Sequence, residues 1–217
     1  MIGQENWESI RDVDFDFKYG DKLQMLEQRY DKGELVIPAK EYWNAHLMFP
    51  NIDDIKVIII GDTPFRQWYA SDGFAFSSLD PDAIDYQMRR LYDKLYYEIG
   101  VVYDRSDNSK QKWLDRGVLC LPHTPLIYKN DKDLTKQLRG RSEDLLSLLA
   151  SDDTPRAFVS LLSYPTGNIF KILRRAKENG HLIVQVPMTS EEFMKIPIFT
   201  AVNNFILTQY KTIIDWT

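Results

Sequence analysis

The sequence predicts an α/β fold with a central, mainly parallel sheet of four strands flanked by helices. Four short apolar runs, each of strand length, alternate with segments of helical character, which is the order typical of a parallel sheet. Each run is continuously apolar, as expected when helices cover both faces of a strand. The runs lie at residues 55–60, 117–121, 157–162 and 182–186.

Helical periodicity appears at residues 20–31 and 84–99, and in the second segment the apolar residues recur on one face. A third predicted helix, 167–180, ends at a glycine, a common helix terminator. Ligands of such folds bind at the carboxyl ends of the strands. The loops expected to carry function are therefore those that follow the first, second and last strands, at 61–66, 122–128 and 187–198.

Length and composition predict an ordinary globular protein. A chain of 217 residues, 44% apolar and 27% charged, fits one domain over 1–217, in which 1–34 forms a helical extension. No apolar run approaches the roughly 20 residues that cross a bilayer, and the polar N-terminus lacks signal-peptide character. With Cys120 as the one cysteine, no internal disulfide forms. We therefore expect a monomer without membrane contact in a reducing compartment, cytoplasmic or nuclear.

Charge and histidine spacing bound the possible partners. The formal net charge of −5 argues against strong non-specific binding of nucleic acid, because that binding depends on Lys and Arg neutralising phosphates. A local basic patch remains compatible with this balance. The three histidines, His46, His123 and His181, lie far apart and show no metal-ligand spacing. We therefore expect neither a metal nor another cofactor.

The first functional loop carries an extended motif. Residues 57–78 read VIIIGDTPFRQWYASDGFAFSS. This segment resembles the water-activating motif of family-1 uracil-DNA glycosylases, in which an apolar strand precedes Gly-Gln-Asp-Pro-Tyr-His and then Gly-Leu-Ala-Phe-Ser. Phe65 replaces the motif Tyr. The positions that match are Gly61, Pro64, Gly73, Ala75, Phe76 and Ser77.

Three further segments carry the same resemblance in the same order along the chain. The segment that leads into the first strand, the run WLDRGVLCL at 113–121 and the closing IDWT at 214–217 are similar to segments of that family. The resemblance covers roughly residues 35–217. It implies a uracil-DNA glycosylase-like fold and a function in DNA repair or DNA modification.

The resemblance also implies roles for particular residues. Enzymes of the family flip a nucleotide out of the duplex into a tight pocket. Phe76 matches the Phe that stacks on the base, and Phe65 matches the Tyr that walls off the 5-position of the base. The expected DNA contacts are Ser77 of the matched motif and Phe193, which matches the Leu that wedges into the base stack.

The chain departs from the family at its three polar site positions. Thr63 stands where an Asp positions the attacking water, and Pro122 stands where an Asn reads the edge of the base. Thr189 falls, within one residue, at the position of the His that stabilises the departing uracil. Asp62 lies one position before the motif Asp, so it substitutes only if the loop turns its side chain into the pocket; Arg66 offers a cation at the position of the motif His. The ordinary roles of these two residues are a helix cap and a surface charge.

Acidic residues also stand where the family has Ser- and Pro-rich loops that hold phosphates. Asp80, Asp82, Glu191 and Glu192 would repel phosphates there, which weakens duplex binding. Their ordinary interpretation is as solvated loop or cap charges.

Three interpretations of function remain. In the first, the chain reads or processes a non-uracil or modified base in DNA, including single-stranded DNA, with Asp62, Thr63 and Thr189 as candidate catalytic residues and Phe65, Phe76 and Pro122 around the base. In the second, it is an inactive copy of the fold that binds a protein of DNA metabolism. In the third, ordinary uracil excision, the chain would have to act without three polar groups that the family uses.

Overall fold

The structure is a computed structural model that describes residues 16–104 and 106–217. Its central sheet has the strand order β3-β2-β5-β6, and every neighbouring pair is parallel. The predicted four-stranded parallel sheet is therefore confirmed. The strands are β2 (Val57–Gly61), β3 (Val118–Pro122), β5 (Ala157–Ser160) and β6 (Leu182–Gln185).

Two strands are shorter than predicted at one end: β2 begins two residues later, and β5 ends two residues earlier. The apolar residues just before β2 lead out of a short 3-10 helix, Ile52–Asp54, and the run that forms β5 ends before Leu161 and Leu162. Both leucines are nevertheless buried, at 2% exposure each. An apolar run in the sequence predicts that its residues are buried. It does not distinguish a residue within a strand from a buried residue in the adjoining loop.

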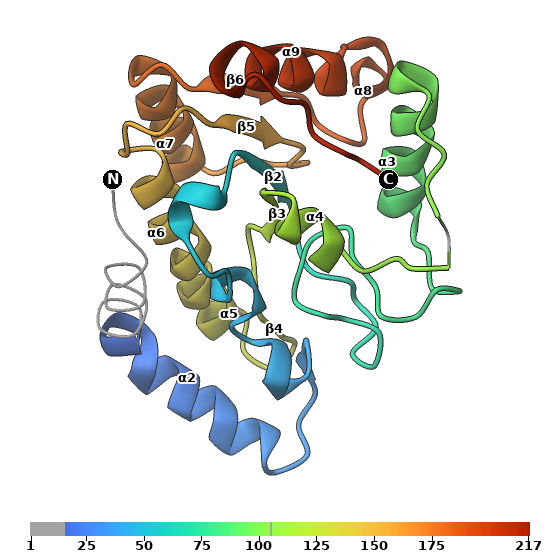
Figure 1. Ribbon diagram of the computed structural model, residues 1–217. Helices are drawn as coiled ribbons and strands as arrows, with labels where there is room; N and C mark the ends of the chain where they lie inside the picture. The colour runs from blue at the N-terminus through green and yellow to red at the C-terminus, as the bar shows by residue number, and fades with distance from the viewer. Residues whose placement is uncertain (1–15, 105) are drawn as a thin grey trace.

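Helices cover the sheet on both sides (Figure 1). On one side α6 packs beside α7, which lies against β6, and on the other α3 packs beside α9, which lies against β5 and β6. The helices are α2 (Asp16–Tyr30), α3 (Tyr86–Ile99), α4 (Gln111–Asp115), α5 (Lys132–Leu138), α6 (Gly140–Leu149), α7 (Gly167–Glu178), α8 (Glu192–Lys195) and α9 (Ile198–Tyr210).

Local signals fix the ends of the helices that flank the site. The Asp85 carboxylate accepts the Met88 N–H at 2.8 Å and begins α3, which ends at Gly100 with a φ of 70°. Thr166 caps α7 in the same manner. The first residues of α9 donate backbone N–H bonds to the carboxylate of Glu98, so the C-terminal turn of α3 holds the N-terminus of α9.

A smaller apolar cluster lies beside the main core. Two short strands, β1 (Val36–Ile37) and β4 (Ile127–Tyr128), pair antiparallel. Leu26 of α2 is fully buried and packs in the cluster with residues of these strands and of α5. The predicted helical extension over 1–34 thus contains an integral helix, and residues 1–15 of that prediction lie outside the described part. None of the described helices is long and apolar enough to cross a membrane.

Candidate functional site at the carboxyl ends of the strands

The loop that follows β2 places Asp62 against the loop that follows β5. The Asp62 carboxylate accepts hydrogen bonds from the Ser163 N–H at 3.2 Å and from the Ser163 hydroxyl at 2.8 Å. A longer bond of 3.5 Å comes from the Gln87 amide of α3. Thr63, at the position of the motif Asp, is partly exposed. Asp62 therefore ties three segments of the carboxyl edge together through its side chain.

The Phe76 ring lies directly on the backbone of Gly61. A Cβ at Gly61 would stand 2.7 Å from the Phe76 Cζ and 2.8 Å from the Ala75 Cβ, so only glycine fits here. Phe76 adopts a φ of 58°, a left-handed conformation that is costly for a bulky residue and is concentrated at functional sites. Phe65 and Phe76 are 6% and 5% exposed, and both belong to the main apolar core.

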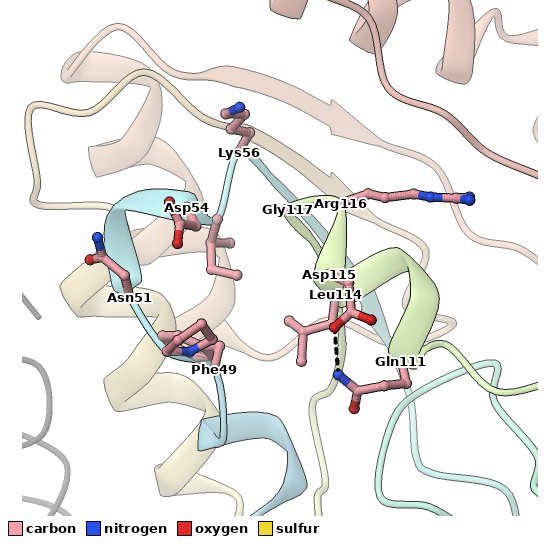
Figure 2. A pocket seen from close by; sticks show the side chains of 11 residues that line it. Phe49, Asn51, Asp54, Lys56, Gln111, Leu114, Asp115, Arg116 and Gly117 are labelled. Carbon is pink, nitrogen blue, oxygen red and sulfur yellow. Dashed lines mark hydrogen bonds between the residues drawn. The ribbon is translucent and has the colours of Figure 1, made fainter.

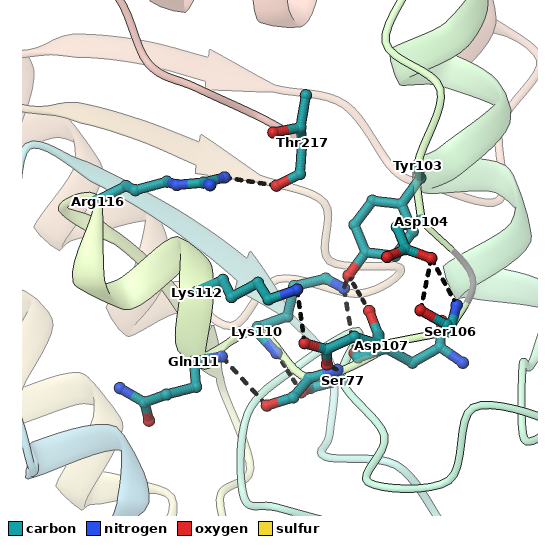
Figure 3. Close-up of polar contacts among 12 residues, drawn as sticks. Ser77, Tyr103, Asp104, Ser106, Asp107, Lys110, Gln111, Lys112, Arg116 and Thr217 are labelled. Atoms are coloured by element: carbon teal, nitrogen blue, oxygen red, sulfur yellow. Dashed lines mark hydrogen bonds and ion pairs between the residues drawn. The ribbon is translucent and has the colours of Figure 1, made fainter.

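A polar network fixes the loop that carries Phe76, and Figure 3 shows its contact between Ser77 and Lys110. The buried Ser77 donates to the Asp72 carboxylate and accepts the Lys110 backbone N–H at 2.8 Å. Burial raises the pKa of Asp72, although bonds from Ser77, Phe74 and Ser109 oppose that shift. Ser77 is fully buried, so the expected contact between this hydroxyl and DNA is not available in this conformation. Its hydrogen bonds instead hold the backbone that follows Phe76.

The Lys110 side chain ends in a buried aromatic cage. Its Nζ donates to the hydroxyls of Tyr103 at 2.8 Å and Tyr92 at 3.1 Å, and it lies 5.0 Å from the centre of the Trp113 ring. Burial lowers the pKa of Lys110 from its usual 10.5 to about 8. The ammonium is therefore a charge that the folded state tolerates at a cost.

Replacement of Lys110 with methionine is expected to change how stability depends on pH. Between about pH 8 and pH 10.5 the unfolded wild type binds more protons than the folded form, so this lysine makes stability rise with pH in that window. Lys110→Met removes that rise, which amounts to about 3 kcal/mol over the window. Urea unfolding of both proteins at pH 7, 8, 9 and 10 measures the difference, and a difference independent of pH would contradict the assignment.

A histidine that the sequence analysis did not assign to the site, His123, lies at the carboxyl edge of the sheet directly after β3. Pro122 pairs with Gly61 and remains within the sheet, while His123 donates its backbone N–H to the Gly61 carbonyl at 2.8 Å. The His123 Nε2 lies 2.9 Å from a carboxylate oxygen of Glu143 on α6. The bond from His123 lowers the pKa of Glu143, as do those from Asn168 and Thr166, against the effect of burial.

These contacts make Glu143 a second junction between loops. It joins the end of β3 to the start of α7, as Asp62 joins the end of β2 to the loop after β5. Spacing along the chain could not show this, because His123 and Glu143 lie on different elements. A histidine directly after a predicted central strand was the available signal.

In the loop after β6, residues 187–198, one of the two residues expected to face DNA or a base is exposed and the other is buried. Thr189 is exposed, as a residue that faces a ligand requires. Phe193, in contrast, is 0% exposed, and the Arg90 guanidinium lies 5.3 Å from the centre of its ring. The ring of Phe193 is therefore not available for contact with DNA in this conformation. The short helix α8 turns this side chain into the core, and the sequence pattern of the loop did not predict that helix.

Three hollows on the surface lie at different places relative to the candidate site. A hollow of about 460 Å³ opens at the amino ends of β2 and β3, opposite the candidate site, with Asn51 and Asp54 on one side and Gln111 and Asp115 on the other (Figure 2). A second, of about 350 Å³, is lined by Asp72 and Phe74 beside the Phe76 loop. A third, of about 190 Å³, lies at the carboxyl ends of β5 and β6.

Titratable side chains show no arrangement for a metal ion. Within residues 16–104 and 106–217, no group of three or more His, Cys, Asp and Glu side chains could hold one. Cys120 is buried within β3, and burial raises the pKa of its thiol to about 12, which removes it as a nucleophile.

Comparisons with known proteins agree with this architecture. No protein-family model matches the chain. The uracil-DNA glycosylase of Bordetella petrii is 27% identical over 202 residues, which cover 88% of this chain and 77% of that protein. The uracil-DNA glycosylase of Bacillus cytotoxicus is 25% identical over 223 residues, which cover 99% of this chain and 96% of that protein.

Solved structures give the same result for the fold. The crystal structure of mimivirus uracil-DNA glycosylase superposes with a TM-score of 0.70 at 16% identity, covering 92% of this chain and 86% of that one. A mimivirus variant in complex with UGI reaches a TM-score of 0.76 at 14% identity, covering 97% and 86%. This chain thus has the uracil-DNA glycosylase fold and resembles uracil-DNA glycosylases in sequence over most of its length.

Proposed function

We propose that this protein binds DNA and reads or processes a base other than uracil, without ordinary uracil excision. The names of its relatives support a role in DNA metabolism. The proposal rests on the absence of a carboxylate at the motif position and on the contacts of the neighbouring Asp62. The motif position holds Thr63, and the neighbouring Asp62 carboxylate is engaged by the Ser163 N–H, the Ser163 hydroxyl and the Gln87 amide.

Threonine at position 63 changes what the loop contributes to catalysis. Its hydroxyl can accept a hydrogen bond from water, but it carries no charge to stabilise a cationic sugar. General acid–base groups contribute about 10²–10⁴ in rate, and loss of one donor to a developing anion costs about 3–4 kcal/mol. Thr189 and Pro122 provide neither an imidazole nor an amide at the other two motif positions. Together these changes remove the chemistry and the edge contacts that select uracil.

The expected result with uracil-containing DNA is therefore no measurable release of uracil, under conditions in which a uracil-DNA glycosylase acts rapidly. The assay uses single-stranded and duplex substrates, with the Bacillus cytotoxicus relative as the positive control. Asp62→Asn is the matched variant, because it removes the charge with little change in volume. Efficient release by the wild type that Asp62→Asn abolishes would overturn the proposal and show that Asp62 had replaced the motif Asp.

A second candidate function is that of a protein-interaction module that no longer binds a base. It is favoured by the low exposure of Phe65 and Phe76, whose rings belong to the main core. The two functions differ in a direct measurement. A base reader gains thermal stability with a particular nucleobase or modified oligonucleotide, because ligands that bind only the folded state raise its melting temperature. An interaction module shows no such gain with any base at millimolar concentration.

A further inference from the structure

We infer that single-stranded DNA binds along the exposed face of α7, with one unpaired base held in the hollow between α7 and β6. This inference rests on the proposed DNA-binding function for the identity of the polymer. The basic strip lies on α7, outside the matched motifs, while the hollow reaches the last functional loop at Pro187. One hollow, one helix face and the charge of the rest of the chain support the inference.

The hollow has the lining that a nucleobase requires. Its volume of about 190 Å³ is bounded by Pro165, Phe170 and Pro187, with Ser160 and Gln185 also in its lining. Phe170 is 52% exposed although it is a large apolar side chain in the first turn of a helix. A half-exposed ring beside an apolar hollow offers a stacking face, and the Ser160 hydroxyl and Gln185 amide supply polar groups for a base edge.

The exposed face of α7 continues from this hollow as a basic strip. The helix carries four basic residues and one acidic residue, whereas the whole chain has a net charge of −5. Phe170 and Arg174 are four residues apart and therefore neighbours on the helix surface. A shallow hollow of about 570 Å³ is lined by Lys171, Arg174 and Arg175. The basic residues are Lys171, Arg174, Arg175 and Lys177, all exposed.

Most of these cations lack internal partners in the described part of the chain. Arg174 pairs with Glu178 at 3.2 Å, with both side chains largely exposed, while Lys171, Arg175 and Lys177 form no ion pair with any described residue. Lys171 and Arg175 are four residues apart and therefore neighbours on one face of α7, where unpaired exposed cations are suited to the phosphates of a polynucleotide. The ring and the strip together form the combination that binds single strands, namely stacking platforms beside a positive track.

Single strands fit this surface better than a duplex. Bases in a duplex are stacked inside it and cannot enter a hollow, and the strip is only one helix face wide. Tyr164, which precedes Pro165 of the lining in the chain, is 90% exposed and offers a second ring for stacking.

Fluorescence anisotropy with a labelled oligothymidine tests the inference on the full chain. Phe170→Ala is expected to weaken binding about 10-fold, from the loss of one stacked base. The double variant Lys171→Glu/Arg175→Glu is expected to weaken binding at least 10-fold. It should also reduce the slope of log K against log salt by about 1.4, or 0.7 for each phosphate contact.

Matched controls separate this surface from general effects of charge and aromatic content. Tyr97→Ala removes an exposed ring from α3, and Lys129→Glu reverses an exposed charge after β4, so neither should change affinity. Unchanged affinity of the α7 variants, with clear binding by the wild type, would overturn the inference while the proposed function stands. Absence of any DNA binding by the wild type would overturn both. Equal competition by polyglutamate, with no effect of Phe170→Ala, would also overturn the inference by showing a general polyanion surface.

Discussion

Replacement of the buried Arg156 with methionine is expected to lower the free energy of unfolding by about 3–5 kcal/mol. Arg156 is 0% exposed, and its guanidinium holds three segments together at the amino edge of the sheet. It donates to the Ile55 carbonyl at 2.9 Å before β2, to the Leu149 carbonyl at the end of α6 and to the Asp152 carboxylate at 2.7 Å. Methionine fills much of the same space but leaves the Ile55 and Leu149 carbonyls without this donor and the Asp152 carboxylate without its cation.

The chain offers a matched control for this change. Arg174 forms an i,i+4 ion pair with Glu178, as Arg156 does with Asp152, but its side chain is 81% exposed. Arg174→Met is therefore expected to cost about 0.5 kcal/mol or less. Urea unfolding of the two variants measures the contrast. A loss below about 1 kcal/mol for Arg156→Met would show that water or backbone movement satisfies the three acceptors.

The second large effect is expected at the aromatic pair beside Gly61. Phe65→Ala should lower the free energy of unfolding by about 3–5 kcal/mol, because the ring is 6% exposed within the main core. Phe170→Ala, the same chemical change at a 52% exposed ring, is the control and should cost far less. A small effect of Phe65→Ala would show that its ring lies in an open slot rather than in packed core.

A variant of Phe76 distinguishes a role of this ring in base binding from a role in core packing. If a base stacks on Phe76, Phe76→Ala abolishes binding of the nucleobase found in the thermal-shift screen while the protein remains folded. Gly61→Ala approaches the same ring from the other side, because the added Cβ would stand 2.7 Å from the Phe76 Cζ. Such overpacking typically costs about 1–3 kcal/mol. Loss of base binding in both variants supports the reader function, and the absence of any base that binds the wild type supports the interaction module.

The amino-acid sequence by itself determined the sheet and the residues that stand at the matched motif positions. Four continuous apolar runs specify four parallel strands, and β2, β3 and β5 are buried, whereas the edge strand β6 is only partly buried. The helix of 84–99 was also correct to within two residues, since Asp85 and Gly100 mark its ends by local chemistry. Thr63 and Pro122 could be read from the order of motif positions alone.

Only the tertiary structure decided which side chains meet at that edge. Asp62 joins Ser163, and His123 joins Glu143, through contacts between residues on different elements that no spacing rule encodes. Burial of Phe193 was decided in the same way, because helix α8 and the Arg90 side chain enclose a ring that the local sequence left free to face solvent. The period of a sequence specifies which residues are buried along one element. The choice of neighbours across elements depends on how the layers pack, and that choice determines the chemistry of this site.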